Sequence, residues 1–177
     1  MKKIFLVIAF ACGSYVVMAG EHMRKDSIAP DPKDVGSMDG ILKAVYDVIS
    51  GPAAQKRNWD RMRTLFIPQA RLIPAGLRAD GSSGKVMTLE EYIASSGPVL
   101  EKMGFFENEI HRTIDEFGKV VQVFSTYESR KLQADEKPFM RGINSIQLLN
   151  DGKRWWIVTI FWQNETPQLP IPAKYLP

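Results

Sequence analysis

The second half of the chain contains four consecutive segments with the residue pattern of long β-strands. They cover residues 105–117, 119–132, 140–150 and 153–164. Short turns join the first pair and the last pair, and the second of these turns, Asn150-Asp151-Gly152, contains the Asp-Gly pair that favours a β-hairpin. Because consecutive strands joined by short turns pair antiparallel, this half of the chain predicts a meandering antiparallel sheet.

The last of these segments is apolar on both of its faces. Strict alternation places Trp155, Ile157 and Phe161 on one face. It places the remaining apolar residues on the other face, namely Trp156, Val158, Ile160 and Trp162. A sheet face in contact with water would be polar, so we expect one face to pack on helices and the other on a second subunit or the C-terminal tail.

The first half of the chain has helical periodicity. A first helix is predicted, with Asp39 as its cap and Gly51-Pro52 at its end. Its apolar residues at helical spacing are Ile41, Leu42, Val45, Val48 and Ile49. Pro52 suits the first turn of a second helix, whose apolar stripe is Trp59, Met62 and Phe66. The charged residues of this second helix are expected to face mostly water: Lys56, Arg57, Asp60 and Arg61.

A third helix is predicted to begin at Thr88, because Thr88 and Glu91 have the spacing of a capping box. Pro98 has no amide hydrogen and is expected to break or kink this helix. Residues 71–73 predict a short strand between the second and third helices. Three helices followed by a long antiparallel sheet indicate an α+β domain, which we place at residues 38–165.

The first 19 residues have the features of a cleaved signal peptide, with Lys2 and Lys3 before an apolar run and cleavage expected after Ala19. The run from Ile4 to Ala19 is 16 residues long, whereas a membrane-spanning helix needs about 20. A membrane anchor and a lipoprotein attached through Cys12 are the two alternatives. We therefore expect a periplasmic or secreted protein, with no membrane contact after the leader is removed.

The flanking segments of the domain have no apolar periodicity. Residues 20–37 are predicted to be a flexible lead-in, and residues 166–177, with four prolines, an extended tail on the surface. Without the two leader lysines, 21 basic and 20 acidic residues remain, which offers no electrostatic footprint for nucleic acid. The single cysteine lies in the leader and excludes a disulfide framework and a cysteine-built zinc site.

Two segments carry a resemblance to a known family: IHRTIDEFGKVVQVFSTYESR at 110–130 and RGINSIQLLNDGKRWWIVTIFWQNE at 141–165. They resemble the nuclear transport factor 2-like superfamily, in its SnoaL-like branch. The resemblance implies a cone, in which a strongly curved antiparallel sheet wraps around three helices and encloses a pocket. It also implies a homodimer formed through the outer face of the sheet. Members include isomerases, dehydratases, epoxide hydrolases and cyclases as well as proteins that only bind, so the fold alone does not decide the function. No catalytic residue is carried over, because bulges in long strands leave the register of the family's catalytic groups open.

Five residues are candidates for contact with a ligand: Trp59, His111, Arg112, Tyr127 and Trp162. In strict alternation His111 shares a face with Glu109 and Thr113, and a carboxylate beside the ring would make it a general base. The opposite face, with Phe106, Ile110 and Ile114, is more apolar and is expected to face inward unless a bulge intervenes. That alternation places His111 outside and Arg112 inside.

Arg112 is then either ion-paired, with Glu128 or Glu116 as expected partners, or a clamp for a ligand carboxylate or enolate. Tyr127 lies in register with Val121, Val123 and Ser125 in a predicted inward row. Asn144 and Gln147 lie on opposite faces of their strand, so only one of them lines the cone. Trp59 and Trp162 are the predicted pocket walls, which would favour a mainly apolar ligand.

No cofactor or metal is expected, because no phosphate-binding glycine loop and no cluster with metal-ligand spacing occurs in the sequence. Three hypotheses remain open. The first is an exported protein that binds a small apolar molecule without assured catalysis. The second is a cofactor-independent isomerase, dehydratase or cyclase acting on an apolar carbonyl compound. The third is an accessory domain whose cone is filled by its own side chains.

Overall fold

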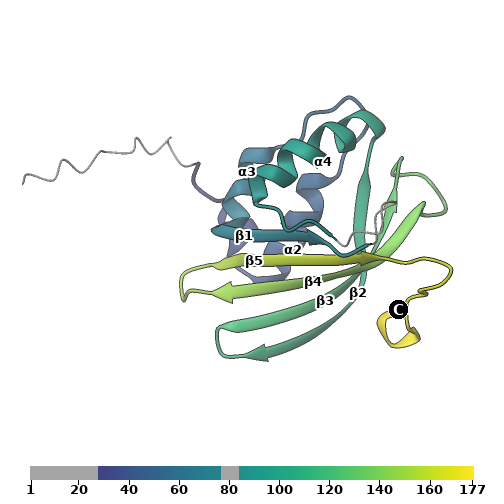
Figure 1. The fold of residues 1–177 in the computed structure, drawn as a ribbon. Coiled ribbons are helices and arrows are strands. Elements are labelled where there is room, and N and C mark those ends of the chain that lie inside the picture. Colours follow the sequence, from purple (N-terminus) through teal and green to yellow (C-terminus); the bar gives the residue numbers. More distant parts are fainter. Residues whose placement is uncertain (1–27, 77–83) are drawn as a thin grey trace, which may run out of the picture.

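The computed structural model describes residues 28–76 and 84–177 and contains one curved sheet with helices on one side of it (Figure 1). The strands are β1 (Phe66–Pro74), β2 (Phe106–Phe117), β3 (Val120–Arg130), β4 (Met140–Asn150) and β5 (Trp155–Asn164). The helices are α1 (Pro32–Val35), α2 (Met38–Ile49), α3 (Trp59–Leu65), α4 (Leu89–Met103) and the short 3₁₀ helix η1 (Ala173–Tyr175). The predicted signal peptide, with Cys12 and Ala19, lies outside the described residues.

The order of the strands across the sheet is β1-β5-β4-β3-β2. The pairs β2–β3, β3–β4 and β4–β5 are antiparallel, which confirms the predicted meander. The predicted short strand at residues 71–73 is the longer β1, which pairs parallel with β5 at the edge of the sheet. The α+β class is confirmed, and the sheet is antiparallel except for this parallel pair at its edge.

Helices α2 and α3 begin at other residues than predicted. Ser37 caps α2, with its hydroxyl accepting from the amide of Gly40 at 3.0 Å, and Asp39 lies inside the helix. Helix α3 begins only at Trp59, and Asn58 caps it. Phe66 is the first residue of β1 rather than a member of the helical stripe. The turn from helix to strand at this point lets Phe66 pack in the core, where it is buried.

Arg57 was predicted to face water, and this prediction was wrong. Its side chain is 7% exposed, and its guanidinium donates hydrogen bonds to main-chain carbonyls at the ends of α2 and α4. The bonds join Nε to Ile49 at 3.0 Å, and Nη2 to Gly51 at 2.6 Å and to Leu100 at 3.2 Å. Carbonyls at a helix end have no partner within the helix, so a cation with several donors satisfies them from the interior.

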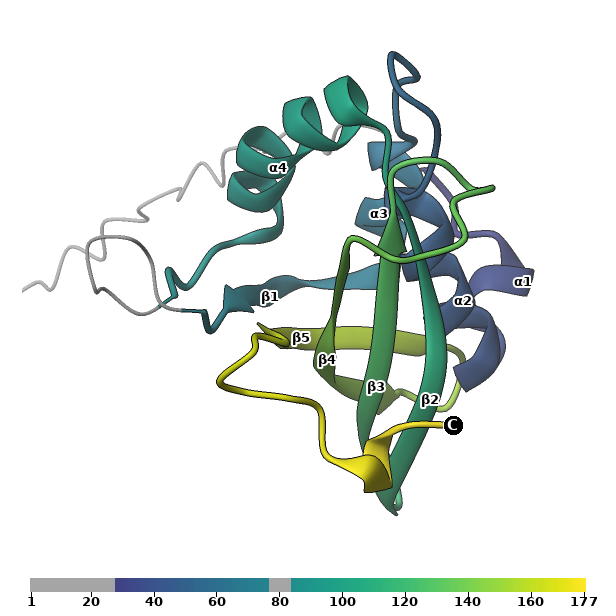
Figure 2. The ribbon, with the colours of Figure 1, turned by 90° about the vertical axis from the view of Figure 1, so that its right-hand side faces the viewer.

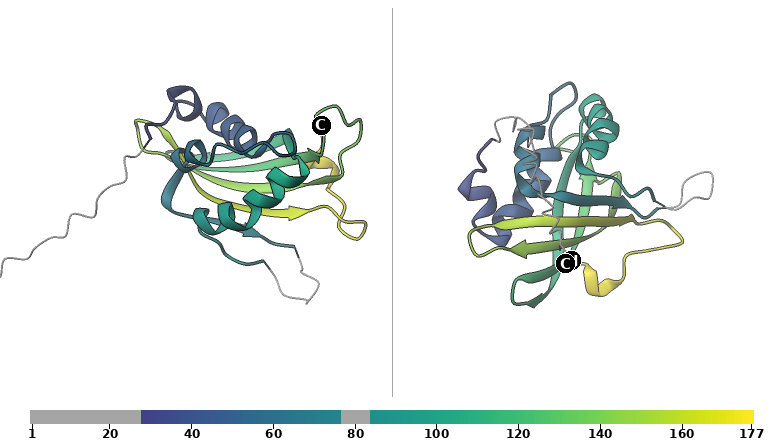
Figure 3. Two further views of the ribbon diagram at one scale, coloured as in Figure 1. Left: turned by 90° about the horizontal axis from the view of Figure 1, so that it is seen from above. Right: turned by 60° about the vertical axis from the view of Figure 1, so that its left-hand side comes forward.

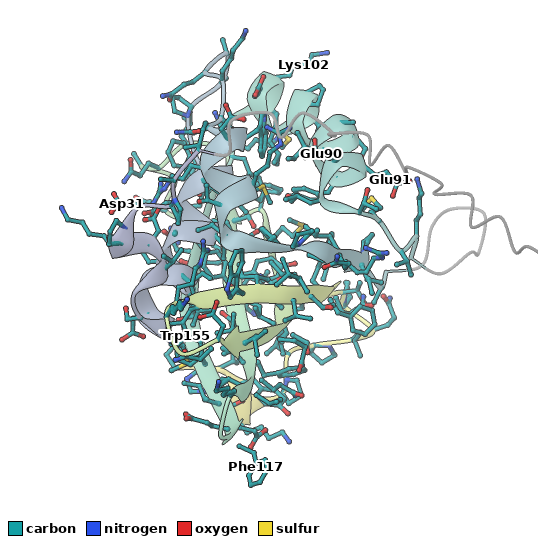
Figure 4. The ribbon with its side chains drawn as sticks, turned by 90° about the vertical axis from the view of Figure 1, so that its left-hand side faces the viewer. Asp31, Glu90, Glu91, Lys102, Phe117 and Trp155 are labelled. Carbon is teal, nitrogen blue, oxygen red and sulfur yellow. The ribbon has the colours of Figure 1, made fainter. Side chains whose placement is uncertain are left out.

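Helix α4 is continuous through Pro98, so the predicted break was wrong. The capping box at its start is confirmed, because Thr88 Oγ1 accepts from the Glu91 amide and the Glu91 carboxylate accepts from the Thr88 amide. Residues 94 and 95, before the proline, are exposed. Water can therefore satisfy the carbonyl that the proline leaves free, which lowers the cost of the missing bond. Figure 4 shows Glu90 and Glu91 at one end of this helix and Lys102 at the other.

Part of the predicted flexible lead-in is helical. Residues 32–35 form α1, capped by Asp31 and fixed to α3 by an ion pair between Asp34 and Arg61. Two guanidinium nitrogens of Arg61 donate to the two carboxylate oxygens of Asp34, at 2.7 and 2.8 Å. This bidentate pair holds the pKa of Asp34 below its ordinary value.

The C-terminal segment crosses the outer face of the sheet and ends with η1 against β2 and β3 (Figure 2). Thr126 on β3 donates its hydroxyl to the carbonyl of Tyr175 at 2.6 Å. The ring of Tyr175 lies 5.0 Å from that of Phe124, and Ile171 is buried. The tail therefore covers part of the outer face. Phe161 on β5 stays 45% exposed, and Phe117 projects from the tip of the β2–β3 turn (Figure 4).

No helix among the described residues is long and apolar enough to cross a membrane.

Candidate functional site

A cavity of about 190 Å³ lies on the inner face of the sheet, where α2 and α4 cover it. Figure 3 shows these helices crossing above the strands. Apolar and aromatic side chains form most of its wall, among them Val45 and Ile49 from α2, Leu100 from α4, and Ile146 and Ile160 from the sheet. A few polar groups interrupt this wall, on Tyr46, Tyr92, Ser96, Glu107, Tyr127 and Asn144.

A β-bulge in β2 decides which acidic residues face the cavity. Glu109 pairs with Tyr127 and His111 pairs with Thr126, so Ile110 is the extra residue between them. The bulge shifts the alternation by one residue, which puts Glu107, Glu109 and Arg112 on the inner face together. Strict alternation had separated Glu109 from Arg112 and joined it to His111, and that prediction was wrong.

Glu107 is the single carboxyl group among the described residues that line the cavity. It is 8% exposed, and one carboxyl oxygen accepts a hydrogen bond from Ser129 Oγ at 2.9 Å. Burial raises the pKa of Glu107 to about 7, and hydrogen bonding by Ser129 and Asn144 offsets this only in part. This carboxyl group therefore keeps its proton to a higher pH than an exposed glutamate does.

A chain of hydrogen bonds runs from the surface to the cavity and fixes the direction of each donor. Glu109 is ion-paired with Arg112 and therefore accepts, so Ser125 must donate its hydroxyl proton to Glu109. Ser125 in turn accepts from the Tyr46 hydroxyl at 2.7 Å, and Asn144 Nδ2 donates to the oxygen of Tyr46 at 3.0 Å. The proton of Tyr46 is thus directed away from the cavity toward Ser125.

Tyr127 and Tyr92 contribute two further hydroxyl groups. The Tyr127 hydroxyl donates to Asn164 Oδ1 at 2.6 Å, which commits its proton as well. The ring of Tyr92 meets that of Trp162 edge to face, with centroids 6.2 Å apart. Within the described part of the chain the Tyr92 hydroxyl has no hydrogen-bond partner. Burial and the charge of Glu107 raise the pKa of Tyr46, Tyr92 and Tyr127, so all three remain neutral.

Tyr127 and Trp162 line the cavity, as does Asn144, while Gln147 lies on the other face. Tyr127 is buried in the predicted inward row with Val121, Val123 and Ser125. Arg112 lies on the inner face but does not line the cavity. Its guanidinium pairs with Glu109 at 2.5 Å and Asp39 at 2.7 Å, so it is ion-paired, with other partners than the predicted Glu128 or Glu116.

His111 and Trp59 lie away from the cavity. His111 is on the outer face, beside Thr126, which is hydrogen-bonded to the tail, and its buried Nε2 has no partner among the described residues. The bulge removes Glu109 from its face, so the predicted carboxylate-oriented base does not form there. Trp59 packs beneath Gly97 of α4 and donates its indole N–H to Glu101 at 3.1 Å.

A second bulge corrects the predicted faces of the last strand. Gln147 pairs with Thr159 and Leu148 pairs with Ile157, so Val158 is the extra residue. The shift places Ile157 on the same face as Ile160 and Trp162, directed toward the core. Phe161 is left on the outer face. The strand is apolar on both sides as predicted, but its residues are distributed differently because the bulge resets the alternation.

Acidic residues and histidines do not form a metal-binding group in the part of the chain that the structure describes. The side chains that carry the chemistry of the cavity are therefore one carboxyl, one amide and several hydroxyl groups.

No family model matches the chain, and no curated protein matches its sequence. Solved structures do match its fold. A nuclear transport factor 2-like protein of unknown function from Silicibacter pomeroyi superposes with a TM-score of 0.51 at 11% identity, covering 73% of this chain and 94% of that one. The chain has the nuclear transport factor 2-like fold.

Two further structures agree with this assignment. A protein of unknown function with a cystatin-like fold from Nostoc punctiforme gives a TM-score of 0.53 at 12% identity, over 73% of this chain and 89% of that one. A candidate ketosteroid isomerase from Shewanella frigidimarina gives a TM-score of 0.50 at 17% identity, covering 71% of this chain and 94% of that one. At these identities the likeness shows the nuclear transport factor 2-like fold and leaves the activity to the residues of the site.

Sequence reasoning missed Glu107, Tyr46 and Tyr92. Tyr46 follows Leu42 by four residues and so belongs to the buried stripe of the first predicted helix. Glu107 follows Phe105-Phe106 and opens the polar run Glu107-Asn108-Glu109, so no local pattern marks its side chain as buried.

Proposed function

We propose that this chain binds a small, mainly apolar molecule in the cavity between α2, α4 and the sheet. The supporting observation is the cavity itself, whose wall is largely apolar and carries a few convergent polar groups. A cavity of about 150 Å³ holds a molecule of the size of benzene. The volume of about 190 Å³ found here suits a ligand somewhat larger than that.

The test is to fill the cavity from one side of α4. Ser96 lines the cavity, whereas the neighbouring Ser95 is exposed, so tryptophan adds the same volume at two positions with opposite consequences. We expect Ser96→Trp to weaken binding of an apolar fluorescent probe at least tenfold, and Ser95→Trp to leave it unchanged. Equal binding by both variants, or no binding by the unmodified chain, would contradict the proposal.

A second function, proton transfer on an apolar carbonyl compound, is supported by Glu107. A carboxyl group whose pKa is about 7 exchanges protons efficiently at neutral pH, and this one faces an apolar cavity. The Tyr92 hydroxyl has no partner among the described residues and is available to donate to a carbonyl oxygen of the ligand. The similar structure from Shewanella frigidimarina is of a candidate ketosteroid isomerase, which agrees with this chemistry.

Exchange of the α-protons of cyclohexanone in D₂O, followed by NMR, tests this second function without knowledge of the substrate. We expect the unmodified chain to accelerate exchange, and Glu107→Gln to lower the acceleration by a factor of about 10² to 10⁴. Glu116→Gln, which removes an exposed carboxylate from the same strand, is the matched control. Acceleration that survives in Glu107→Gln would assign the proton transfer to another group.

Three further parts of the proposal concern the whole protein. We propose that the protein is exported, because its leader has the features of a signal peptide with expected cleavage after Ala19. We also propose that it belongs to the SnoaL-like branch and that it forms a homodimer through the outer face of the sheet. The exposed Phe161 supports an interface there, next to the part that the tail covers. N-terminal sequencing of the periplasmic fraction tests cleavage, and light scattering of the unmodified chain against Phe161→Lys tests the dimer.

A further inference from the structure

The two buried carboxyl groups among the described residues differ in their surroundings. Asp34 is paired with Arg61 through two hydrogen bonds. Glu107 has no basic partner in the described part of the chain, and no described residue that lines its cavity is basic. Burying a carboxylate without a cation costs free energy, so a positive charge placed beside the ionised form would stabilise it.

The wall around Glu107 is rich in aromatic rings. Five of the residues that line the cavity are aromatic: Tyr46, Tyr92, Phe105, Tyr127 and Trp162. Three of these residues are tyrosines from α2, α4 and β3 that line the same cavity as Glu107, and burial together with the charge of Glu107 raises the pKa of each. Aromatic rings attract organic cations, and quaternary ammonium groups are bound in such surroundings.

An anionic ligand is disfavoured by the same arrangement. A carboxylate or phosphate would face the charge of Glu107 and the hydroxyl oxygens of Tyr46 and Tyr127, whose protons are already donated elsewhere, with no basic side chain on the described wall to offset the repulsion. A neutral ligand would gain from the apolar wall but leave the ionised form of Glu107 uncompensated. A cation with apolar substituents satisfies both the aromatic wall and the carboxylate.

We propose that the ligand of this cavity carries an organic ammonium group, with a quaternary or alkylated nitrogen placed between the Glu107 carboxylate and the aromatic rings. This inference deepens the proposed binding function and rests on it. It names the chemical class of the ligand, an apolar molecule with one fixed positive charge. Because the cation favours ionised Glu107, its binding releases a proton wherever Glu107 is protonated in the empty cavity.

Choline and 3,3-dimethylbutan-1-ol form the matched probes, because they have nearly the same shape and differ by the positive charge on the central atom. By calorimetry we expect choline to bind at least tenfold more tightly than the neutral alcohol. Glu107→Gln should remove this preference, and Glu116→Gln, which removes an exposed carboxylate, should retain it. Circular dichroism of each variant shows whether it is folded.

The pH dependence of the unmodified chain gives a readout that needs no variant. The pKa of Glu107 is about 7, so the affinity for choline should rise about tenfold between pH 6 and pH 8. The affinity for the neutral alcohol should not rise. The other titratable groups that line the cavity with Glu107 are Tyr46, Tyr92 and Tyr127, whose raised pKa keeps them neutral throughout this range. Glu109 and Arg112, on the same face of β2, form an ion pair with each other.

Each other outcome decides against the inference. Equal or tighter binding of the neutral alcohol overturns the ammonium assignment and leaves the proposed binding function intact. Binding of neither probe also overturns it, and the proposed function then depends on the separate comparison of Ser96→Trp with Ser95→Trp. A choline affinity that is the same at pH 6 and pH 8 assigns any binding to a place other than Glu107.

Discussion

Helices α2 and α4 cover the same face of the sheet and each supplies one tyrosine to the cavity, yet they pack very differently. Helix α2 buries seven residues: Ile41, Leu42, Ala44, Val45, Tyr46, Val48 and Ile49. The longer α4 buries only Gly97 and Leu100. Both helices line the cavity, but only the first also fills the hydrophobic core with most of its side chains. We infer that stability depends mainly on α2.

The largest expected effect comes from the residue that joins the two helices. Arg57→Met should lower the free energy of unfolding by about 4 kcal/mol, because it leaves carbonyls at the ends of both α2 and α4 without donors. Chemical denaturation measures the change. Lys56→Met, at an exposed neighbour, is the control and should have little effect. A loss below about 1 kcal/mol in Arg57→Met would mean that water replaces the guanidinium.

A pair of truncations compares the helices directly. Leu42→Ala in α2, where the side chain is 1% exposed, should cost about 3 to 4 kcal/mol because it leaves a cavity in the core. Val99→Ala in α4, where the side chain is 56% exposed, should change stability by less than about 0.5 kcal/mol. Thermal unfolding measures the loss of stability in each variant, and similar losses in Leu42→Ala and Val99→Ala would show that α4 is packed as firmly as α2.

Because Glu107 is buried in the cavity that α2 and α4 cover, the stability of the chain should depend on pH. The folded chain holds the Glu107 proton up to a pKa of about 7, whereas an unfolded glutamate loses it near its ordinary value of 4.5. Unfolding therefore releases a proton in this window, so stability falls as pH rises through it and levels off above it. Relative to Glu107→Gln, we expect a fall on the order of 3 kcal/mol between pH 5 and pH 8. Parallel pH profiles of the two proteins would contradict this.

The smallest effect concerns the helix caps. Ser37→Ala and Thr88→Ala each remove an N-cap, which typically costs about 1 kcal/mol. In α2 the loss should appear in global unfolding, because the helix is part of the core. In α4 it should appear as faster hydrogen exchange confined to residues 89–103, with global stability nearly unchanged. An equal global loss in both variants would remove the distinction between the helices.

Sequence patterns predicted the positions of helices and strands better than the face of a strand on which each side chain lies. The capping box at Thr88, the four long strands and the buried row ending at Tyr127 all follow from local spacing, and the structure confirms them. Glu109 was assigned to the wrong face of β2 because Ile110 is a bulge, and one extra residue reverses the faces of the residues before it relative to those after it. Arg57 was misplaced because its partners are carbonyls from two helices far apart in the sequence.

The sequence by itself determined the α+β class, the order of the elements and the apolar character of both faces of β5, because these depend on periodicity and on turns a few residues long. Only the tertiary structure decided that Glu107, Tyr46 and Tyr92 meet at one cavity. The physical reason is that two bulges set the register, and that the carboxyl group acquires its raised pKa from burial by elements distant in the chain.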